Sequence, residues 1–597
     1  MNGAVHVNVL ADNIVSPLGL TSRANLEAVL AGRSGVRLHG AGTLGNPEPF
    51  TASLLDRDEM ERLFVSSGIS GRYSFLEKLA VLSAAAAVEE SGIDPSDPDT
   101  VFVVSSTKGN VGNLGKGDVL LHESARRLAE HFGNGNDPVV ISNACISGVC
   151  AELVAMRALR AGRWRRAVVT GVDCLSPFII SGFQSFRALS AEPCRPFDSA
   201  RCGLNLGEAA ATVVLEACGE HPAVPLREIL GGCVRNDANH ISGPSRTGEG
   251  SFLCLDYLLG GDGGPGLVRP EELAAVNLHG TATAYNDEME SIALSRAGLS
   301  GVPANSLKGF FGHTLGAAGV LETIMSMHAV ERGLVLPTLG FENLGVSCPV
   351  NVSAQLRQTD RRAFIKLISG FGGCNAAVAF RLGAAGAEER VVPEEPVPDR
   401  IRIKGRIDIT PGRAVLNGRP VEITAACGED VSGRGFLTAL YRSAGTAWPK
   451  FFKMDSLSRL GFMASELLLD AVEPSERFVP RKDRGVIFFN RSASLCNDMH
   501  YLKTISDPLD RFPSPALFVY TLPNIVCGEI AIRNRWYGET MFFISDGFDG
   551  RGEMETVCRE LCDRGMESAL CGWVECADDD NYEAHVFLVE KNAKNLQ

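Results

Sequence analysis

Val139-Val-Ile-Ser-Asn-Ala-Cys145-Ile-Ser-Gly-Val-Cys-Ala-Glu152 is the stretch that decides the fold. Its β-branched start, residues 139–141, predicts a short buried strand, and the apolar spacing from Val149 to Arg160 predicts a helix. Cys145 therefore lies at a strand-to-helix turn, where unpaired N–H groups and the helix dipole favour the nucleophilic thiolate. The alternative is a buried structural cysteine, which is the commoner role of cysteine in a cytosolic protein.

The bulk composition narrows the class of protein. A chain of 597 residues is long enough for several domains with large cores. Its 45% hydrophobic residues and 64 glycines are typical of a compact α/β protein, not of a fibre or a disordered chain. The formal net charge of −14 argues against general nucleic-acid binding.

Targeting signals and cysteine spacing point to the cytoplasm. The first residues lack the pattern of a signal peptide. No apolar run approaches the roughly 20 residues that cross a bilayer, so we expect no membrane span. The 17 cysteines are scattered, without close CxxC pairs or a Cys/His ligand spacing. We therefore expect reduced thiols, no disulfide framework and no metal site.

Strands and helices alternate through the first part of the chain. Val101–Ser105 and Ala167–Asp173 have the composition of buried strands, which predicts a mainly parallel sheet covered on both faces. A second round of similar order runs from about residue 229 to 370 and indicates internal duplication. Residues 386–400 are acidic and proline-rich, so we expect a linker there, followed by a further module at 401–597.

Three other stretches place polar residues at strand ends among small residues. They are Leu278-His279-Gly-Thr281-Ala-Thr283, Asn305-Ser-Leu-Lys308 with the following Gly312-His313-Thr, and Ser369-Gly-Phe371-Gly-Gly-Cys-Asn375. A single histidine in such a setting is more often structural. Two histidines, each beside glycine and threonine, favour a shared functional site.

These motifs, in this order, resemble the β-ketoacyl-[acyl-carrier-protein] synthases, decarboxylating condensing enzymes of the thiolase-like fold. The Cys–His–His set resembles the elongating type. The resemblance implies a duplicated α/β fold layered α-β-α-β-α over 1–385, with halves at about 1–218 and 219–385, and an additional C-terminal α/β module. The matching motifs are Asn-Ala-Cys145-Ile-Ser-Gly, Arg-Pro-Phe-Asp198, Gly207-Glu208, His279-Gly-Thr-Ala-Thr283, Lys308 with Gly-His313-Thr-Leu-Gly-Ala-Ala-Gly319, and Gly-Phe371-Gly-Gly-Cys-Asn375.

The resemblance implies a role for each central motif. Cys145 would take the acyl chain from a carrier-protein thioester, which divides the condensation into two easier steps. The backbone N–H groups of Cys145 and Phe371 would form the oxyanion hole. His279 and His313 would hold the malonyl thioester carbonyl, with hydrogen bonds that strengthen as decarboxylation converts it into an enolate.

Substrate contacts follow from the same resemblance. Thr281 and Thr283 would contact the phosphopantetheine arm, and Ile146 and Phe371 would line the substrate site. No cofactor is implied, because the substrates are carried on the phosphopantetheine of an acyl carrier protein. That carrier protein is the expected partner.

Supporting residues form a second group. Lys308 would order the site electrostatically with Glu322, although a purely structural ion pair is the alternative. Three further acidic residues are expected to be scaffold residues, namely Asp198, Glu208 and Asp287.

Several positions depart from the family pattern or leave two interpretations open. The departures indicate an acyl pocket shaped differently from that of housekeeping fatty-acid synthases. They are Asn143, Ile146, Tyr285 and Ala377. The Asn-Ala-Cys-Ile-Ser-Gly form resembles synthases of bacterial aryl-polyene and resorcinol-type pathways. A basic cluster could dock the acidic carrier protein, with a solvated helix end as the favoured alternative. It comprises Arg157, Arg160, Arg163, Arg165 and Arg166.

Residues 401–597 resemble an abridged N-terminal half of the synthase. In the alignment that we infer, Leu517–Glu529 resembles the Cys145 stretch, and Leu522 aligns with Cys145. We therefore expect an inert module whose strand Ala516–Tyr520 packs against the synthase, like an inactive chain-length-factor partner. A module held for stability alone is the alternative.

The sequence thus predicts an elongating ketosynthase fused to a degenerate half-synthase, assembled as a homodimer or a pseudo-dimer through its ketosynthase-like halves. A thiolase or another acyltransferase is one rival, which the two histidines and the missing second thiolase cysteine oppose. A non-catalytic scaffold or chain-length subunit for another synthase is the other. The complete Cys–His–His set argues against that rival.

Overall fold

The computed structural model describes residues 5–69, 73–218, 226–261, 263–383, 401–423, 432–507, 511–561 and 565–591. The linker expected at 386–400 and the boundary at 385 lie outside the described residues. No described helix is both long enough and apolar enough to cross a membrane.

The first sheet carries the Cys145 stretch at its edge. Val and Ala dominate its three central strands, which are buried on both faces. Its first two pairings are antiparallel and its last two are parallel. In order across the sheet, the strands are β1 (His6–Val15), β8 (Ala209–Cys218), β6 (Arg166–Asp173), β4 (Thr100–Ser105) and β5 (Val139–Ile141).

The second sheet repeats this order and these directions, as the inferred duplication predicts. It meets the first sheet where β9 pairs with β1 at Asn8. In order, its strands are β9 (Leu226–Asn236), β16 (Cys374–Gly383), β15 (Ala363–Gly370), β10 (Leu273–Asn277) and β11 (Pro303–Asn305).

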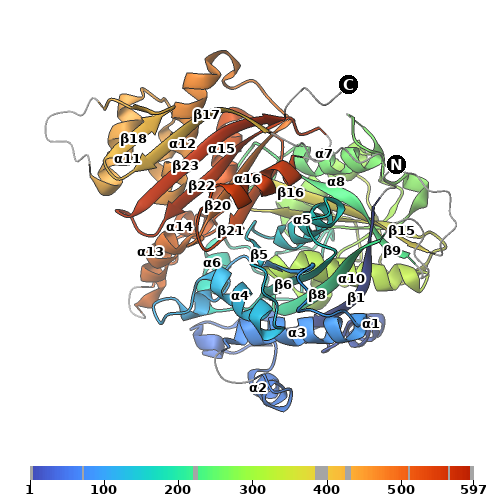
Figure 1. The fold of residues 1–597 in the computed structure, drawn as a ribbon. Coiled ribbons are helices and arrows are strands. Elements are labelled where there is room, and N and C mark those ends of the chain that lie inside the picture. Colours follow the sequence, from blue (N-terminus) through green and yellow to red (C-terminus); the bar gives the residue numbers. More distant parts are fainter. Residues whose placement is uncertain are drawn as a thin grey trace.

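Two buried helices separate these sheets. Helices α5 (Ser147–Arg160) and α10 (Ala318–Glu331) contact strands of both sheets. Both are apolar on nearly all sides, which suits a helix enclosed by protein. Helix α3 (Phe75–Ser91) covers the outer face of the first sheet, and α7 (Glu249–Leu259) covers that of the second, with α8 (Ala284–Arg296) beside it. The layering α-β-α-β-α expected from the sequence is confirmed (Figure 1).

Residues 401–591 add a third sheet with the same strand order and directions. Helix α12 (Ser456–Val472) packs on three of its strands, as α3 packs on the first sheet. Figure 1 shows this sheet, orange to red, beside β5 and α5. In order, its strands are β17 (Ile401–Thr410), β23 (Tyr582–Lys591), β22 (Ser568–Cys576), β20 (Arg484–Asn490) and β21 (Thr540–Ile544).

The strand that joins this module to residues 5–383 is not the predicted one. Residues 515–519 form helix α14 (Pro515–Val519) because Ser514 caps its N-terminus and proline occupies the first turn. Strand β21 pairs with β5 instead, in antiparallel direction, at Phe543–Ile141 and Ile544–Val140.

The inferred register of the C-terminal module is therefore wrong at the counterpart of the Cys145 stretch. Because β21 corresponds to β5, the counterpart of the Cys145 turn is 545–550, Ser-Asp-Gly-Phe-Asp-Gly, and not Leu522. The helix that follows this turn is α16 (Arg551–Glu560), whereas α15 (Ile525–Asn534) precedes β21. The turn 545–550 contains no cysteine.

The remaining elements connect the three sheets or cover their ends. They are α1 (Ser22–Leu30), β2 (Val36–His39), β3 (Phe50–Ser53), α2 (Arg57–Ser66), α4 (Leu121–His131), α6 (Pro177–Ser185), β7 (Leu206–Gly207), α9 (Lys308–Phe311), β12 (Leu334–Val335), β13 (Asn351–Val352), β14 (Arg357–Gln358), β18 (Arg413–Leu416), β19 (Arg419–Pro420), α11 (Gly433–Ser443) and α13 (Leu495–Ser506).

The interface between residues 5–383 and the C-terminal module contains buried charge. Arg157 of α5 is 8% exposed and donates to Glu539 at 2.8 Å and to Glu560. Arg157 is thus neither a carrier-protein contact nor part of a solvated face. The other four arginines of the predicted basic cluster contact residues within 5–383: Arg160 donates to Ile229 and Leu230, Arg163 lies over Trp164, and Arg165 and Arg166 pair with Glu216.

Removing the Arg157 charge should destabilise the whole protein. We predict that Arg157→Met lowers the free energy of unfolding by about 3–5 kcal/mol, because Glu539 and Glu560 lose a buried cation. Urea denaturation followed by fluorescence measures this. Arg165→Met is the matched control, because Arg165 is 62% exposed, and its expected effect is within about 0.5 kcal/mol. Equal midpoints for the two variants would contradict the prediction.

Candidate active site

Cys145 lies between β5 and α5, as the sequence predicts. Ala144 adopts a left-handed backbone conformation (φ 49°), and Ile146 directly precedes the first turn of α5. The Ser147 hydroxyl accepts from the Asn143 N–H at 2.7 Å and donates to the Ala144 carbonyl at 2.6 Å. These bonds fix a tight turn that presents the Cys145 side chain to His313.

A close crossing of the two central helices brings Cys145 to His313. A β-carbon on Gly148 would lie 2.9 Å from the Val320 nitrogen, and one on Gly319 would lie 2.4 Å from the Val149 nitrogen. Side chains at these glycines would force α5 and α10 apart, so both positions require glycine.

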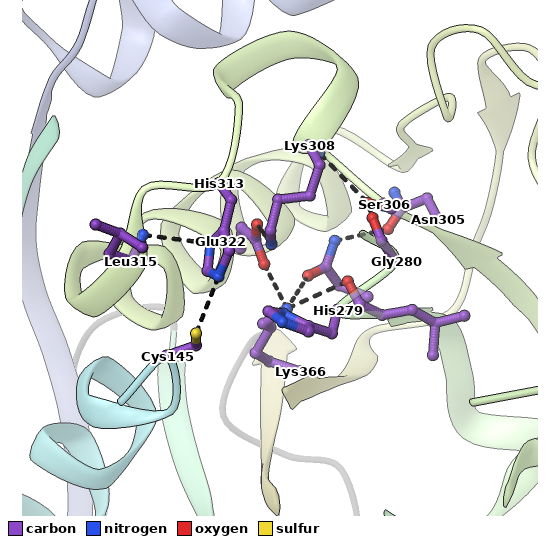
Figure 2. Close-up of polar contacts among 12 residues, drawn as sticks. Cys145, His279, Gly280, Asn305, Ser306, Lys308, His313, Leu315, Glu322 and Lys366 are labelled. Carbon is purple, nitrogen blue, oxygen red and sulfur yellow. Dashed lines mark hydrogen bonds and ion pairs between the residues drawn. The ribbon is translucent and has the colours of Figure 1, made fainter. Parts of the chain in front are cut away.

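His313 is the immediate partner of Cys145 (Figure 2). Its Nε2 lies 3.0 Å from Sγ of Cys145, and the Leu315 N–H donates to its Nδ1 at 3.2 Å. Because Nδ1 accepts that bond, the neutral ring carries its proton on Nε2 and donates toward the sulfur. His313 is therefore a hydrogen-bond donor at this site rather than a base that removes the thiol proton.

His279 faces His313 from the end of β10. The two ring centroids are 5.0 Å apart at an interplanar angle of 84°. Glu290 of α8 accepts from the backbone N–H groups of His279 and Gly280, both at 2.7 Å, and so holds this turn. The His279 Nδ1 is buried without a hydrogen-bond partner among the described residues.

Both imidazoles are neutral at ordinary pH. Burial lowers the pKa of His279 well below its usual range, and the charges of Lys308, His313 and Lys366 act in the same direction. Burial likewise lowers the pKa of His313, with Lys308 and Lys366 as further causes. Neutral rings retain one N–H donor each and do not form ion pairs with the thiolate.

A buried ionic cluster lies beside the histidines. Glu322 of α10 binds Lys308 through one carboxylate oxygen and Lys366 through the other. Both lysine side chains are fully buried. Burial acts to raise the pKa of Glu322, but the two lysine charges outweigh it and lower that pKa. The expected pairing of Lys308 with Glu322 is therefore present in the structure, with a second lysine added.

Burial opposes the thiolate that the helix N-terminus is expected to favour at Cys145, and that expectation stays a prediction. Burial raises the pKa of Cys145 to about 12, and Asp173 also acts to raise it, whereas the charge of Lys308 acts to lower it. The raised pKa favours the thiol form of the resting nucleophile. Loss of its proton has to accompany attack on the substrate.

The turn at Phe371 lies close to the backbone of Cys145. A β-carbon on Gly370 would lie 3.2 Å from the Cys145 nitrogen, so the turn that begins at Phe371 passes close to the nucleophile. Asn524 of the C-terminal module donates to the Phe371 carbonyl at 2.8 Å and fixes this turn. The oxyanion hole assigned to the Cys145 and Phe371 N–H groups stays a prediction that this proximity supports.

The predicted substrate-contact residues lie near the histidines. Thr281 and Thr283 follow His279, with their hydroxyl oxygens 2.9 Å apart. Ile146 is fully buried in the core beside the nucleophile, and Phe371 is partly exposed. Their contacts with a phosphopantetheine arm or an acyl chain stay predictions.

The three acidic residues predicted as scaffold hold loops. Asp198 accepts from three backbone N–H groups, those of residues 200, 342 and 343. Glu208 accepts from the N–H groups of residues 55 and 175 and pairs with Arg57. Asp287 accepts from the Phe197 N–H at 2.7 Å. This geometry supports their scaffold role.

The positions that depart from the family pattern do not all line one pocket. Asn143 donates to the Thr540 carbonyl of the C-terminal module at 2.9 Å and is an interface residue. Tyr285 is 80% exposed, and Ala377 is buried within the second sheet. Of the four, Ile146 alone directly neighbours the nucleophile.

Sequence reasoning missed three charged residues of the site. Glu290 holds the His279 turn, and Asp173 accepts from Thr107 and Gly316 near the nucleophile. Lys366 joins the ionic cluster. A signal was available for Lys366, because a charged residue inside the apolar strand Ala363-Phe-Ile-Lys-Leu-Ile is unusual unless it is paired.

Cys145, His279 and His313 also place one sulfur and two ring nitrogens within 4.8 Å of one another. These are donor types that zinc accepts. The expectation of a metal-free site therefore stays a prediction, which elemental analysis of the purified protein checks.

Family models match two adjacent parts of the chain. The model described as "Beta-ketoacyl synthase, N-terminal domain" matches residues 5–221, and "Beta-ketoacyl synthase, C-terminal domain" matches 226–342, together more than half of the chain. A 3-oxoacyl-[acyl-carrier-protein] synthase 2 of Coxiella burnetii is 29% identical over 403 residues, which cover 62% of this chain and 96% of that relative.

Solved structures extend the likeness of fold to the C-terminal module. The PfaC keto synthase–chain length factor matches 99% of this chain and 78% of its own, with a TM-score of 0.73 and 13% identity. AntDE–AntF, a type II polyketide ketosynthase in complex with its acyl-carrier protein, matches 63% of this chain and 99% of its own, with a TM-score of 0.52 and 22% identity.

The raised pKa of Cys145 should govern its reaction with iodoacetamide. We predict that the alkylation rate of Cys145 rises about tenfold per pH unit up to pH 10 without levelling off, because the thiolate fraction keeps increasing. Lys308→Met should slow alkylation further at every pH, because it removes a charge that lowers the pKa.

Intact mass with peptide mapping to Cys145 measures these rates. Free cysteine is the reference compound, since its rate levels off above its pKa of about 8.5. A plateau near pH 7 for Cys145 would mean that its thiolate is already stabilised in the free site.

Proposed function

This chain belongs to the β-ketoacyl synthase family, and we propose that its synthase part catalyses the decarboxylative Claisen condensation of an acyl thioester with malonyl-acyl carrier protein. The product is 3-oxoacyl-acyl carrier protein, for fatty-acid or polyketide synthesis. The observation that carries this proposal is a thiol 3.0 Å from a neutral imidazole that faces a second neutral imidazole.

Acyl transfer to Cys145 is the first step. Sγ attacks the acyl carbonyl of the carrier thioester, the carbon–sulfur bond to the carrier arm breaks, and the thiol proton of Cys145 ends on the released carrier thiol. The Nε2–H of His313 stabilises the developing thiolate at 3.0 Å, and the N–H groups of Cys145 and Phe371 receive the tetrahedral oxyanion.

Decarboxylation needs donors rather than a base. The malonyl carbon–carbon bond breaks, CO2 leaves, and the electron pair forms an enolate on the thioester. Neutral His279 and His313 donate to the thioester oxygen, and these bonds strengthen as negative charge develops there. A protonated His313 would have to turn an Nδ1–H toward the Leu315 N–H, so the fold favours the neutral ring.

Carbon–carbon bond formation completes the cycle. The enolate carbon attacks the acyl carbonyl on Cys145, the second oxyanion occupies the same hole, and the Cys145 sulfur leaves. One proton from solvent restores the thiol. The product remains on the carrier arm, whose entry past Thr281 and Thr283 is part of the proposal.

The C-terminal module is proposed to be a pseudo-subunit. Its sheet pairs with β5 and repeats the strand order of the first sheet, which supports descent from a half-synthase. Its Asn524 bonds the Phe371 turn, so it supports the site directly. A module held for stability alone is the rival role, and the contact with Phe371 favours the active one.

The module also places an aromatic ring behind the site. A β-carbon on Gly182 would lie 2.1 Å from the Phe518 ring, so that glycine makes room for it. Phe518 lies 5.6 Å from Phe183, whose ring stacks on Phe371 at 6.2 Å. This row of rings runs from Phe371 to Phe518 of the C-terminal module. It supports the proposal that this module limits the length of the acyl chain bound at the site.

We further propose a reducing, cytoplasmic location. It is supported by the cysteines of the described residues, which are all free thiols. An acyl carrier protein is the proposed partner, supported by the AntDE–AntF likeness.

The covalent intermediate is the direct test of the activity. Incubation with acyl-carrier protein should add one acyl group at Cys145, and malonyl-carrier protein should then release CO2 and yield the 3-oxoacyl product. Cys145→Ala should abolish the adduct and the product. Cys150→Ala, which changes a buried thiol on the same helix, is the matched control and should keep the adduct. Product formation by Cys145→Ala would contradict the proposed mechanism.

Phe518→Leu should lengthen the product. Shortening this ring opens space at the end of the aromatic row, so we expect longer acyl chains on the carrier protein, by one or more two-carbon units, measured by mass spectrometry. Phe512→Leu is the control, because Phe512 belongs to the same module and is 81% exposed. An unchanged product distribution would favour the stability-only role of the module.

A further inference from the structure

Lys366 occupies a buried position on which both histidine segments depend. It lies within β15, with its Cα paired to Asn277 of β10, and its side chain is fully buried. A lysine in an apolar strand needs partners for all of its ammonium protons. It has three: it donates to Asn277 Oδ1 at 2.8 Å, to the Leu278 carbonyl at 3.3 Å and to Glu322.

Two of these bonds lead to the segments that carry the site histidines, and Figure 2 shows Lys366 with Glu322, Lys308 and both histidines. The Leu278 carbonyl directly precedes His279 in the chain. Glu322 binds Lys308, which begins the short helix α9 that ends just before Gly312 and His313. Lys366 therefore connects the turn that carries His279 with the segment that carries His313.

The charge balance of the cluster is also unusual. Two lysines share one carboxylate, so the buried cluster holds one more cation than anion. Both lysines act on His279 and on His313, lowering the pKa of each ring. An excess positive charge beside the two imidazoles also opposes the negative charge that develops on an enolate in this site.

We propose that Lys366 is a positioning residue for the decarboxylation half-reaction, holding the His279 and His313 segments in register and placing an excess positive charge beside both rings. This inference rests on the proposed function. It differs from the role of Lys308 because Lys366 alone bonds both Glu322 and the carbonyl before His279.

The protonation state of Lys366 should make the rate of decarboxylation depend on pH. Burial lowers the pKa of Lys366 to about 8, with Lys308 acting in the same direction and Glu322 in the opposite one. Decarboxylation should therefore fall as pH rises through about 8, where the ammonium group is lost. The other ionisable groups that act on this position are Glu322 of α10, Lys308 of α9, Glu290 of α8, Glu152 of α5, and the two histidines.

The test separates the two half-reactions across pH 5.5–9.5. One assay measures transfer of the acyl group to Cys145, and the other measures CO2 release from malonyl-carrier protein. Lys366→Met should slow CO2 release by about 10- to 100-fold, as expected for a lost positioning contact, while acylation stays within about twofold. In the pH profile of CO2 release, the fall above about pH 8 (the alkaline limb) should disappear. The fall at low pH (the acidic limb) should move to higher pH, because the pKa values of the two histidines rise.

Lys366→Arg keeps the test decisive if Lys366→Met fails to fold. Arginine retains its charge at every pH used, so CO2 release should lose its alkaline limb while keeping most of its rate. Lys404→Met is the matched control. Lys404 also joins two groups, Glu473 and Glu590, but it lies in β17 of the C-terminal module, and its loss should leave both half-reactions and both pH limbs unchanged.

The outcomes separate the inference from the proposed function. If the wild-type protein neither acylates Cys145 nor releases CO2, the proposed function fails. If the wild-type protein is active but shows no alkaline limb, or if either Lys366 variant keeps that limb near pH 8, the inference about Lys366 is overturned and the proposed function stands.

Discussion

The antiparallel pairing of β5 with β21 is the interaction on which the candidate site depends. An unpaired β5 would expose a strand edge immediately before the nucleophile turn, where movement would displace Cys145. Strand β21 of the C-terminal module pairs with this edge and supplies its hydrogen-bond partners. The module also extends the contact beyond the strand, because the Ser142 N–H donates to the Phe542 carbonyl at 3.1 Å and Asn143 donates to Thr540. The module therefore holds the residues that lead into the nucleophile.

Buried charge reinforces the two regions that this pairing brings together. At the interface, one arginine bridges two glutamates from the C-terminal module. In the site, one glutamate bridges two lysines of the synthase part. A bridge of this kind fixes the relative position of the elements that carry its ends, since losing one partner leaves a buried charge uncompensated. The helix α5 takes part at both places, with Cys145 before its start and Arg157 near its end.

Local patterns in the sequence were sufficient for the nucleophile turn, the layered fold and the approach of His279 and His313. Each depends on residues within one strand–turn–helix unit or on a motif shared with a known family. The C-terminal module was harder, because strand pairing is a tertiary property. The apolar run at 516–520 predicts a strand, but Ser514 and Pro515 start a helix there, and β21 takes the edge of β5. Lys366 was missed because its partners come from β10 and α10, which are distant in the chain.

The central claim is that one chain contains both an active synthase and the second half that such a site requires. Sedimentation of the protein through a solution of acyl- and malonyl-carrier protein tests this claim. Product forms only where the active species sediments, and the sedimentation rate of that band gives the mass of the active species. The account predicts that the 3-oxoacyl product forms in the band of a single chain, at 63.7 kDa. Activity confined to a species of twice that mass, with an inactive single chain, would contradict it.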